Sequence, residues 1–448
     1  MRTRIALLCA TFCGQLYAAA PPGPSGEGDL ATWLLPQLER ETGIRVYGVI
    51  DAGYSRNDTS KTSERDGGLT NLPVAGYADE KFELAFVNLF IEKVLNAPYL
   101  TRITPLPGPQ PTDYSLGFNL GLLYGRDGQF SRTVGWDEHW GVNEPGATDA
   151  DYSRRNRQKY YSFPDLFGTA YLPVGTGISV MAGIFGPGIG YEIPPNIRLA
   201  RNAFATKTYA FVSEPATVSG VVLGSRLFSG SSGVLGAELG VVQGWNNLRD
   251  NNDQQSLLGA VRWRTNDMQT WVDYEFILGD EQNKDFSDVQ APTARLISPD
   301  GQFKQQHSLN AWHAFDERWS AGAEVVYGKQ DGDGKSSTID IVTGPGFDGA
   351  HWWGANTSIS YKYQDDLTFS VRAEHFNDPQ GFAIFPVSLA HGSFNSLTVG
   401  LRYEASRNLS IRPELRYDRF NGRETDHPFG NGRDRDQTTA TVEALLYF

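Results

Sequence analysis

The chain has 448 residues, of which 20% are charged and 12% aromatic, and it carries 49 glycines and a formal net charge of −13. This acidic balance excludes a nucleic-acid-binding protein, which needs a basic surface. No apolar run reaches the ~20 residues that a transmembrane helix requires. If the chain spans a membrane, it therefore does so as a closed β-barrel, the other structure that satisfies every backbone polar group in lipid.

Residues 1–20 have the pattern of a secretory signal peptide. Arg2 and Arg4 precede an apolar stretch, and small residues follow at positions 18–20, which predicts cleavage near Ala20. A first core helix is the other interpretation of this stretch. Both cysteines, Cys9 and Cys13, lie inside it, so the mature chain is expected to hold neither a disulfide nor a cysteine metal site.

Residues 21–44 are predicted to form an N-terminal linker on the periplasmic side. The linker begins with "PPGPSGEGD", whose proline and glycine content is typical of a flexible segment. The following stretch, "LATWLLPQLERETG", predicts a short amphipathic helix that is interrupted near Pro36. Residues 45–448 are predicted to form the barrel, because the strand pattern begins at Arg45.

The strand pattern is clearest in residues 268–279, "MQTWVDYEFILG". Apolar Val272 and Tyr274 alternate with Asp273 and Glu275, and such strict alternation indicates a strand with two different faces. In a membrane barrel the apolar face points to lipid and the polar face lines a wet lumen. In a soluble sandwich the apolar face would point to the core instead.

Sixteen such stretches follow one another along the chain. Most run ten to fourteen residues, longer than the ~5–6 residues of a typical soluble strand and close to the ~9–11 that cross a bilayer at a tilt. Their predicted spans are 45–55, 82–94, 115–125, 159–173, 176–186, 217–229, 233–244, 256–264, 268–279, 303–315, 318–329, 350–363, 366–377, 393–405, 408–419 and 436–448.

The connections between these strands alternate between short turns and long polar loops. This rhythm is typical of outer-membrane barrels, which have turns on the periplasmic side and loops outside. One connection, residues 95–114, breaks the rhythm, because it is long and rich in proline where a short turn is expected. We predict an all-β, transmembrane, antiparallel up-and-down barrel of about sixteen strands, with fourteen or eighteen as alternatives. The long loops are predicted at 56–81, 126–158, 187–216, 280–302, 330–349, 378–392 and 420–435.

Aromatic residues fall near the ends of the predicted strands, where the two interfacial girdles of a membrane barrel belong. Ordinary enrichment of aromatic residues in strands is the alternative explanation. The candidates are Tyr124, Trp245, Trp319, Tyr327, Trp353, Tyr363, Tyr403 and Tyr417.

The chain ends on Phe448 while the alternating pattern is still in progress. Apolar residues from Ala440 to Phe448 alternate with Thr441 and Glu443, so the first set is predicted to face lipid and the second to face water. This last strand must pair with the first, near residues 46–54, to remove both sheet edges. A terminal aromatic residue also resembles the signal by which barrel precursors are recognised for insertion, and Phe448 is predicted to be that assembly signal.

Several stretches resemble the OmpL-like outer-membrane β-barrel porin family. They follow the order of that family over roughly residues 45–448. The resemblance implies a porin-like channel in the outer membrane of a Gram-negative bacterium, and it names no solute. The stretches are "YGVIDAGYSRN" at 47–57, "FGPGIGYE" at 185–192, "RNAFATKTYAFVSEP" at 201–215, "GWNNLRDNN" at 244–252 and "IRPELRYDRF" at 411–420.

The third long loop, residues 187–216, is the predicted constriction of the channel. A barrel of 16–18 strands leaves an aqueous channel. General porins fold their third loop into that channel, and loop 187–216 resembles this arrangement by its position. An external loop packed on its neighbours is the alternative. The candidate constriction residues are Glu192, Arg198, Arg201 and Lys207.

Charged residues share one face of several predicted strands and are expected to point inward, because each would cost about 2–4 kcal/mol on the lipid face. Rings of charge set ion selectivity in wide pores. We therefore predict that solutes pass between loop 187–216 and the arginines of this wall. Structural salt bridges that neutralise one another are the alternative, and both can hold. The wall residues are Asp273, Glu275, Arg372, Glu374, Arg402, Glu404, Arg412, Glu414 and Arg416.

The predicted function is passive diffusion of small hydrophilic solutes or ions through an outer-membrane porin. A porin selective for sugars or organic acids is an alternative, because Trp271 falls on the lumen face. An outer-membrane hydrolase is a further alternative, but Ser370 and His375 fall on opposite strand faces. The seven histidines show no metal-ligand spacing, so neither a metal nor another cofactor is expected.

The protein class also predicts the partners. They are outer-membrane lipid and lipopolysaccharide, the barrel-assembly machinery and small hydrophilic solutes. General sixteen-stranded porins are often trimers, so a homotrimer is one assembly to test. No nucleic acid is expected.

Overall fold

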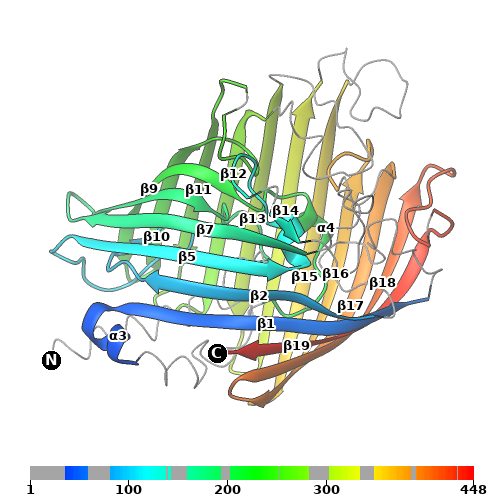
Figure 1. The fold of residues 1–448 in the computed structure, drawn as a ribbon, viewed down its shortest axis with the longest axis horizontal. Coiled ribbons are helices and arrows are strands. Elements are labelled where there is room, and N and C mark those ends of the chain that lie inside the picture. The colour runs from blue at the N-terminus through cyan, green and yellow to red at the C-terminus, as the bar shows by residue number, and fades with distance from the viewer. Residues whose placement is uncertain are drawn as a thin grey trace.

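The computed structural model describes the chain from residue 36 onward and closes most of it into one barrel (Figure 1). Within the described ranges a 17-stranded antiparallel sheet joins its own ends. One member, β6 (Gly141–Val142), is a two-residue strand laid beside β7, so the barrel wall has 16 long strands, as predicted. The described ranges are 36–58, 81–137, 140–142, 159–192, 202–250, 252–281, 302–332, 348–384, 390–430 and 432–448.

Each wall strand overlaps one predicted stretch, and each pairs with its neighbours along the chain. Short turns alternate with long connections at the two ends of the barrel, which we call the turn end and the loop end. The wall strands are β1 (Ile44–Asn57), β2 (Lys81–Lys93), β5 (Ser115–Gly125), β7 (Lys159–Leu172), β8 (Ile178–Phe185), β9 (Val218–Gly230), β10 (Gly233–Val242), β11 (Ser256–Arg264), β12 (Thr270–Asp280), β13 (Phe303–Ala314), β14 (Trp319–Asp331), β15 (Gly349–Gln364), β16 (Leu367–Asp378), β17 (Gly392–Ser406), β18 (Leu409–Gly422) and β19 (Asp436–Tyr447).

A short helix, α3 (Pro36–Thr42), precedes the first strand. Proline stands at its first position, where the missing N–H would have no helical partner in any case. The described helix begins at Pro36, and residues 30–35 of the predicted helix lie outside the described residues. Gly43 ends the helix with a φ of +73° and donates its N–H to the Glu39 carbonyl at 2.8 Å. Among the described residues, no helix is both long and apolar enough to cross a bilayer.

The barrel closes where the last strand meets the first. β19 pairs with β1 from Tyr447 opposite Val49 to Thr439 opposite Asn57. Phe448 lies one residue beyond β19 and exchanges backbone hydrogen bonds of 3.0 and 2.8 Å with Gly48. Its ring lies so close to Gly48 that a Cβ there would overlap it. The predicted pairing of the chain ends is confirmed, and it leaves neither strand with a free edge.

Aromatic residues on the outward face form two rows, one near each end of the strands. At the loop end the rings of Trp353 and His375 are 4.9 Å apart, and at the turn end those of Trp319 and Tyr361 are 4.6 Å apart. Trp319 and Tyr327 are eight residues apart on β14, or about 26 Å along the strand. A barrel tilt of about 40° reduces this to roughly 20 Å, close to the ~25 Å apolar band of an outer-membrane barrel.

Seven of the eight predicted girdle residues lie on the outward face, fully or half exposed, and Trp245 does not. Trp245 is only 8% exposed and packs inside the barrel, with the Lys304 ammonium 3.3 Å from its ring centroid. The prediction for Trp245 was wrong because this residue lies beyond the end of β10. Gly244, with a φ of +97°, turns the chain there, so strand alternation no longer fixes the direction of the next side chain.

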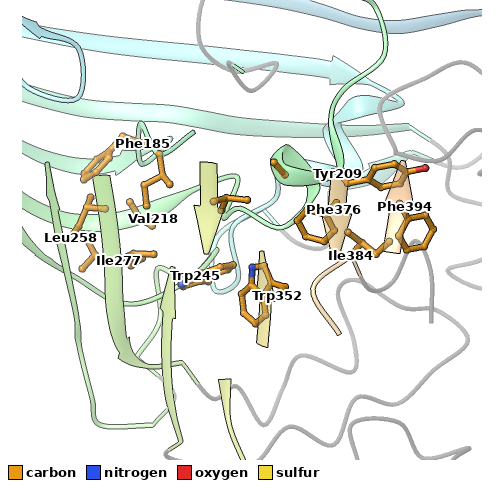
Figure 2. Packing of buried hydrophobic residues seen from close by; sticks show 14 of the residues in the cluster. Phe185, Tyr209, Val218, Trp245, Leu258, Ile277, Trp352, Phe376, Ile384 and Phe394 are labelled. Atoms are coloured by element: carbon orange, nitrogen blue, oxygen red, sulfur yellow. The ribbon is translucent and has the colours of Figure 1, made fainter. Parts of the chain in front are cut away.

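A small apolar core lies inside the barrel at its loop end (Figure 2). Inward side chains such as Trp352, Phe376 and Phe394 are at most 1% exposed. They pack around Tyr209 of an inserted helix, whose ring centroid lies 4.7 Å from that of Phe394. The sequence predicted a polar lumen face throughout, and this end of the lumen is apolar because the strands must bury the apolar side chains of an inserted loop.

Residues 133–137 and 140–142 complete the wall where β8 is too short. Because β8 ends at Phe185, the first residues of β7 pair instead with β6, Gly141 opposite Tyr160 and Val142 opposite Lys159. The Trp140 carbonyl also accepts a hydrogen bond from the Tyr161 N–H at 3.1 Å. The other end of the segment reaches the next long loop, where the Val134 N–H donates to the Asn246 carbonyl at 2.7 Å. The wall is thus continuous at the point where the chain leaves β8 for the interior.

Candidate functional site

The connection from β8 to β9, residues 186–217, runs inside the barrel and is called the inner loop below. Residues 186–192 and 202–217 of it are described. It contains the one-turn helix α4 (Tyr209–Val212), which begins after Thr208, whose hydroxyl accepts from the Phe211 N–H at 3.1 Å. Figure 1 shows α4 within the ring of strands. The inner loop is therefore an internal element over its described length, and not an external loop.

Carboxylates of the wall accept hydrogen bonds from the backbone of the inner loop. An irregular segment inside a barrel leaves backbone N–H groups that need acceptors, and ionised carboxylates form strong hydrogen bonds with them. Predicted wall residues Glu275, Glu374 and Glu414 take this role. The bonds run from Gly190 to Glu275 at 2.8 Å, from Tyr191 to Glu324 at 3.1 Å, from Ala205 to Glu414 at 2.8 Å and from Tyr209 to Glu374 at 2.6 Å.

Arginines of the wall donate to the carbonyl groups of the same loop. Arg372, Arg412 and Arg416 are 2%, 3% and 1% exposed. The sequence predicted that these side chains face solute across a gap, but they are bonded to the loop that was placed opposite them. Loop carbonyls need donors as much as loop N–H groups need acceptors, which explains the arrangement. The bonds join Arg372 to the Thr206 carbonyl at 3.0 Å, Arg416 to the Lys207 carbonyl at 2.7 Å and Arg412 to the Asn202 carbonyl.

Glu192, a predicted constriction residue, ties the inner loop both to itself and to the wall. Its Oε2 accepts from the Thr208 N–H at 2.7 Å, and its Oε1 accepts from Arg372 Nη1 at 2.6 Å. The side chain is buried, at 7% exposure. Its position explains how the two described halves of the loop stay together. Two other candidates, Arg198 and Arg201, lie outside the described residues.

The remaining predicted wall residues lie away from the inner loop. Asp273 accepts from Arg262 Nη1 and Arg264 Nη2, both at 2.8 Å. Arg402 donates to Glu404 two positions away on the same face of β17. These pairs agree with the alternative prediction of lumen salt bridges, because each charge has an opposite charge beside it. Asp273 and Arg402 are 4% and 3% exposed, as side chains on the inward face of a strand would be.

Lys207 differs from the other charged residues of the inner loop. The residue is only 4% exposed, so its ammonium lies inside the barrel. The nearest aromatic ring, that of Phe211, has its centroid 5.9 Å away. Burial lowers the pKa of the Lys207 ammonium, and the Glu192 carboxylate is the strongest influence that raises it. Burying an ammonium is costly, and the nearby carboxylates Glu192, Glu443 and Asp127 favour its charged form.

Asp127 is a second buried charged residue, close enough to Lys207 for the two charges to influence each other. It begins η2 (Asp127–Phe130), a 3-10 turn that packs against β2, β5 and β7. The carboxyl is 5% exposed, and its Oδ1 has no hydrogen-bond partner. Burial raises its pKa to about 7, and the charges of Lys207 and Arg126 oppose that rise. Lys207 and Asp127 are therefore two buried, oppositely charged residues, one on the inner loop and one on η2, and each influences the pKa of the other.

Comparison with models of protein families identifies the family of this chain. The model of the family described as "Putative beta-barrel porin-2, OmpL-like" matches residues 43–448. The chain belongs to this family. A search of curated proteins found no match. The family therefore supports a porin and an outer-membrane location.

Solved structures share the fold of this OmpL-like porin at low sequence identity. The outer-membrane channel DcaP of Acinetobacter baumannii is 9% identical, with a TM-score of 0.52, and the alignment covers 90% of this chain and 97% of that one. OmpF of Salmonella typhi, solved in complex with daunomycin, is 11% identical, with a TM-score of 0.51 and the same two coverages. At such identities the likeness concerns the fold alone.

Several residues that organise the interior of this porin were not among the sequence candidates. Glu324 is one, and Arg262 and Glu238, which meet at 3.0 Å, are two more. The sequence held a signal for each of these three residues, because each is charged and lies on the face of its strand that the alternation predicts to point inward. Asp127 carried no such signal, since it follows the end of β5 and strand phase does not extend to it.

Proposed function

We propose that this porin is a water-filled channel that admits small hydrophilic solutes and ions by passive diffusion, narrowed by the inner loop. The observation that carries the proposal is the attachment of that loop to the inside of a 16-stranded wall by charged hydrogen bonds. Eight-stranded barrels fill their own interior, whereas sixteen strands enclose more space than their side chains occupy. An internal loop fixed in that space sets the width that remains.

Lys207 and Asp127 are the proposed constriction residues. Both residues are buried, and Asp127 Oδ1 has no hydrogen-bond partner among the described residues, so a water or solute group is the proposed partner of these charges. The arginines Arg372, Arg412 and Arg416 take a different part in this proposal. They hold the loop at its place, and the Lys207 ammonium meets the solute.

The proposal is tested by ion selectivity in planar bilayers. Lys207→Gln is expected to shift the reversal potential in a salt gradient toward cation selectivity, since it removes a positive charge from the constriction. Asp127→Asn is expected to shift it the other way at a pH above about 8, where the carboxyl is ionised. Arg318→Gln, at an exposed turn-end position, serves as the matched control. Unchanged selectivity in both constriction variants would remove these residues from the constriction.

A sugar-selective channel is a second candidate, supported by one contact. Trp271 faces the lumen, and its ring stacks on that of Tyr191 with centroids 5.7 Å apart and planes at 23°. Aromatic faces of this kind bind sugar rings in polar channels. If this candidate is correct, maltose-type oligosaccharides will block single-channel current, and Trp271→Ala will abolish the block. If these oligosaccharides do not block the current, the unselective channel is the remaining candidate.

A hydrolase on the barrel wall has less support. Ser370 points inward and shares a hydrogen bond of 2.8 Å with Ser360, whereas His375 points outward against Trp353. The two side chains therefore lie on opposite faces of β16 and form no catalytic pair. Incubation with detergent-dispersed phospholipid is expected to release no fatty acid.

The predicted partners stay predictions. Lipid, lipopolysaccharide and the barrel-assembly machinery follow from the protein class, as does the homotrimer. Light scattering of the purified protein, corrected for detergent, distinguishes a trimer from a monomer. The signal peptide and the linker up to residue 35 lie outside the described residues.

A further inference from the structure

The one long connection at the turn end, residues 94–114, contains a hairpin at 95–111 that enters the barrel. Its strands β3 (Tyr99–Leu100) and β4 (Thr104–Pro105) pair with each other. The tip is Arg102, which has a φ of +66°. Because the other turn-end connections are short, this segment, called the turn-end hairpin below, is an inserted element.

The hairpin packs against one site on the inner wall, formed around Gly224 and Gly236 and called its seat below. The Tyr99 ring is fully buried and lies against Gly224 of β9 and Gly236 of β10. A Cβ at either glycine would overlap the ring, so the ring fits only because both side chains are missing. The Ser179 hydroxyl donates to the Tyr99 carbonyl at 2.6 Å, which fixes the backbone over the same seat.

Charged side chains of the wall hold the carbonyl groups of the hairpin. Arg226 Nη1 donates to the carbonyls of Leu106 and Gly108 at 2.7 and 2.8 Å. Arg264 Nη2 donates to the Ile103 carbonyl at 3.3 Å. The turn-end hairpin is therefore attached in the same manner as the inner loop, from the other end of the barrel.

The tip of the hairpin contacts the beginning of the inner loop. Arg102 Nη1 donates to the Gly186 carbonyl at 2.6 Å, at the point where the chain leaves β8. The Arg102 N–H donates to Glu238 Oε2 at 2.6 Å, and the guanidinium lies 4.7 Å from the Phe167 ring centroid. The side chain is 6% exposed. Arg102 therefore joins two insertions that approach from opposite ends of the channel.

We propose that the turn-end hairpin is a second permeability-limiting element, which narrows the lumen beside β8 to β11 and, through Arg102, fixes the beginning of the inner loop. The inference rests on the proposed channel function. It adds that the size limit for solutes is set by two insertions and not by the inner loop alone. The hairpin takes up lumen cross-section that a sixteen-stranded barrel with a short turn would leave to water.

The first test replaces residues 97–109 by a short Gly-Ser turn. Single-channel conductance is expected to rise roughly twofold, because one side of the lumen is vacated, and liposome swelling is expected to admit larger sugars. Heat-modifiable migration confirms that the barrel has formed. Equal conductance and an equal sugar size limit in formed barrels with and without the hairpin would overturn the inference while leaving the proposed function intact. Barrels that conduct no ions with or without the hairpin would overturn the proposed function itself.

The second test displaces the hairpin without changing its sequence, in case the replacement prevents folding. Gly224→Ala with Gly236→Ala is expected to push the Tyr99 ring from its seat and raise conductance. Adding Tyr99→Ala to that variant removes the overlap and should lower conductance again. Gly168→Ala is the matched control, because a Cβ there meets no atom within 4 Å. Wild-type conductance in the two-glycine variant would count against the inference.

The contact between Arg102 and the beginning of the inner loop can be tested separately, by proteolysis. Arg102→Gln is expected to increase tryptic cleavage after Lys207, because the beginning of the inner loop loses a charged hydrogen bond. Arg318→Gln should leave the cleavage rate unchanged. Equal cleavage in wild type and Arg102→Gln would show that the hairpin does not fix the inner loop.

Discussion

Arg416 of β18 donates from Nη1 to the carbonyl of Lys207 at 2.7 Å, so a wall arginine fixes the backbone of a proposed constriction residue. The same guanidinium donates to both carboxylate oxygens of Asp418, at 2.9 Å from Nε to each. Arg416 is thus an internal clamp between the strand and the inner loop. This relationship makes selectivity depend on residues that the solute does not touch.

The first prediction concerns Arg416→Gln. Removal of one partner of a buried ion pair costs about 3–5 kcal/mol, so the temperature at which the barrel unfolds in detergent will fall. Selectivity will also shift toward cations, because Lys207 is no longer held at its position. If Arg416 acts only through Lys207, the double variant with Lys207→Gln will have the selectivity of Lys207→Gln alone. Additive shifts would instead mean that Arg416 itself faces solute.

The second prediction concerns Glu414→Gln. Glu414 accepts from the N–H groups of Ala205 at 2.8 Å and of Thr206 at 3.2 Å. Hydrogen bonds to a charged group contribute about 1.5–3 kcal/mol, so the inner loop will open more often and be cut faster by trypsin after Lys207. Glu424→Gln, at an exposed position in a loop-end connection, is the control. A cleavage rate equal to that of the control would contradict the attachment.

The third prediction is a pH dependence of selectivity that Asp127 causes. Burial raises its pKa from 3.8 to about 7, so the carboxyl is neutral at pH 5 and ionised at pH 9. Cation selectivity is therefore expected to rise through about pH 7 in the wild type. Because folding raises this pKa, ionisation disfavours the folded state, and this group's effect on stability becomes unfavourable as pH rises from 3.8 through 7. The charged groups that face Asp127 are Lys207, Arg126, Glu443 and Glu83.

Asp127→Asn is the control for that prediction, since an amide keeps the shape and does not titrate. Reversal potentials in a salt gradient between pH 5 and pH 9 supply the measurement. If the variant keeps the full pH dependence of the wild type, then another group is responsible. The lowered pKa of Lys207 would also increase cation selectivity at high pH, and Lys207→Gln separates the two contributions.

Much of the barrel could be predicted because its signals are local. Alternation along each strand fixes which side chains face inward, so Arg372 and Glu374 could be placed on the lumen face from the sequence. Turn lengths then give the order and direction of strands. What alternation cannot give is the partner of an inward charge. Arg372 bonds with Glu192, which is 180 residues away in sequence, and that pairing depends on where a loop folds.

The turn-end hairpin also shows what local sequence signals can and cannot predict. Its length and prolines marked residues 95–114 as an exception, but nothing local indicated that the segment turns inward. The signal that could have found it is on the wall, in the inward glycines Gly224 and Gly236. A glycine inside a strand marks a close approach by another group, and two on adjacent strands mark room for a ring. To draw this inference, the inward face of each strand must be assigned first, and the side chain that fills the space beside the two glycines must then be found.

The last prediction concerns Phe448 and the closure of the barrel. Its backbone forms two hydrogen bonds with Gly48, and its half-buried ring covers that glycine on the outward face. Deletion of Phe448 removes both bonds from the seam that closes the sheet, so the yield of heat-modifiable barrel in outer membranes will fall. Phe448→Ala retains the backbone bonds and tests the ring alone as the predicted assembly signal. If Phe448→Ala assembles normally while the deletion fails, then assembly depends on the backbone hydrogen bonds of Phe448 and not on its ring. Normal assembly of both variants would contradict the predicted signal.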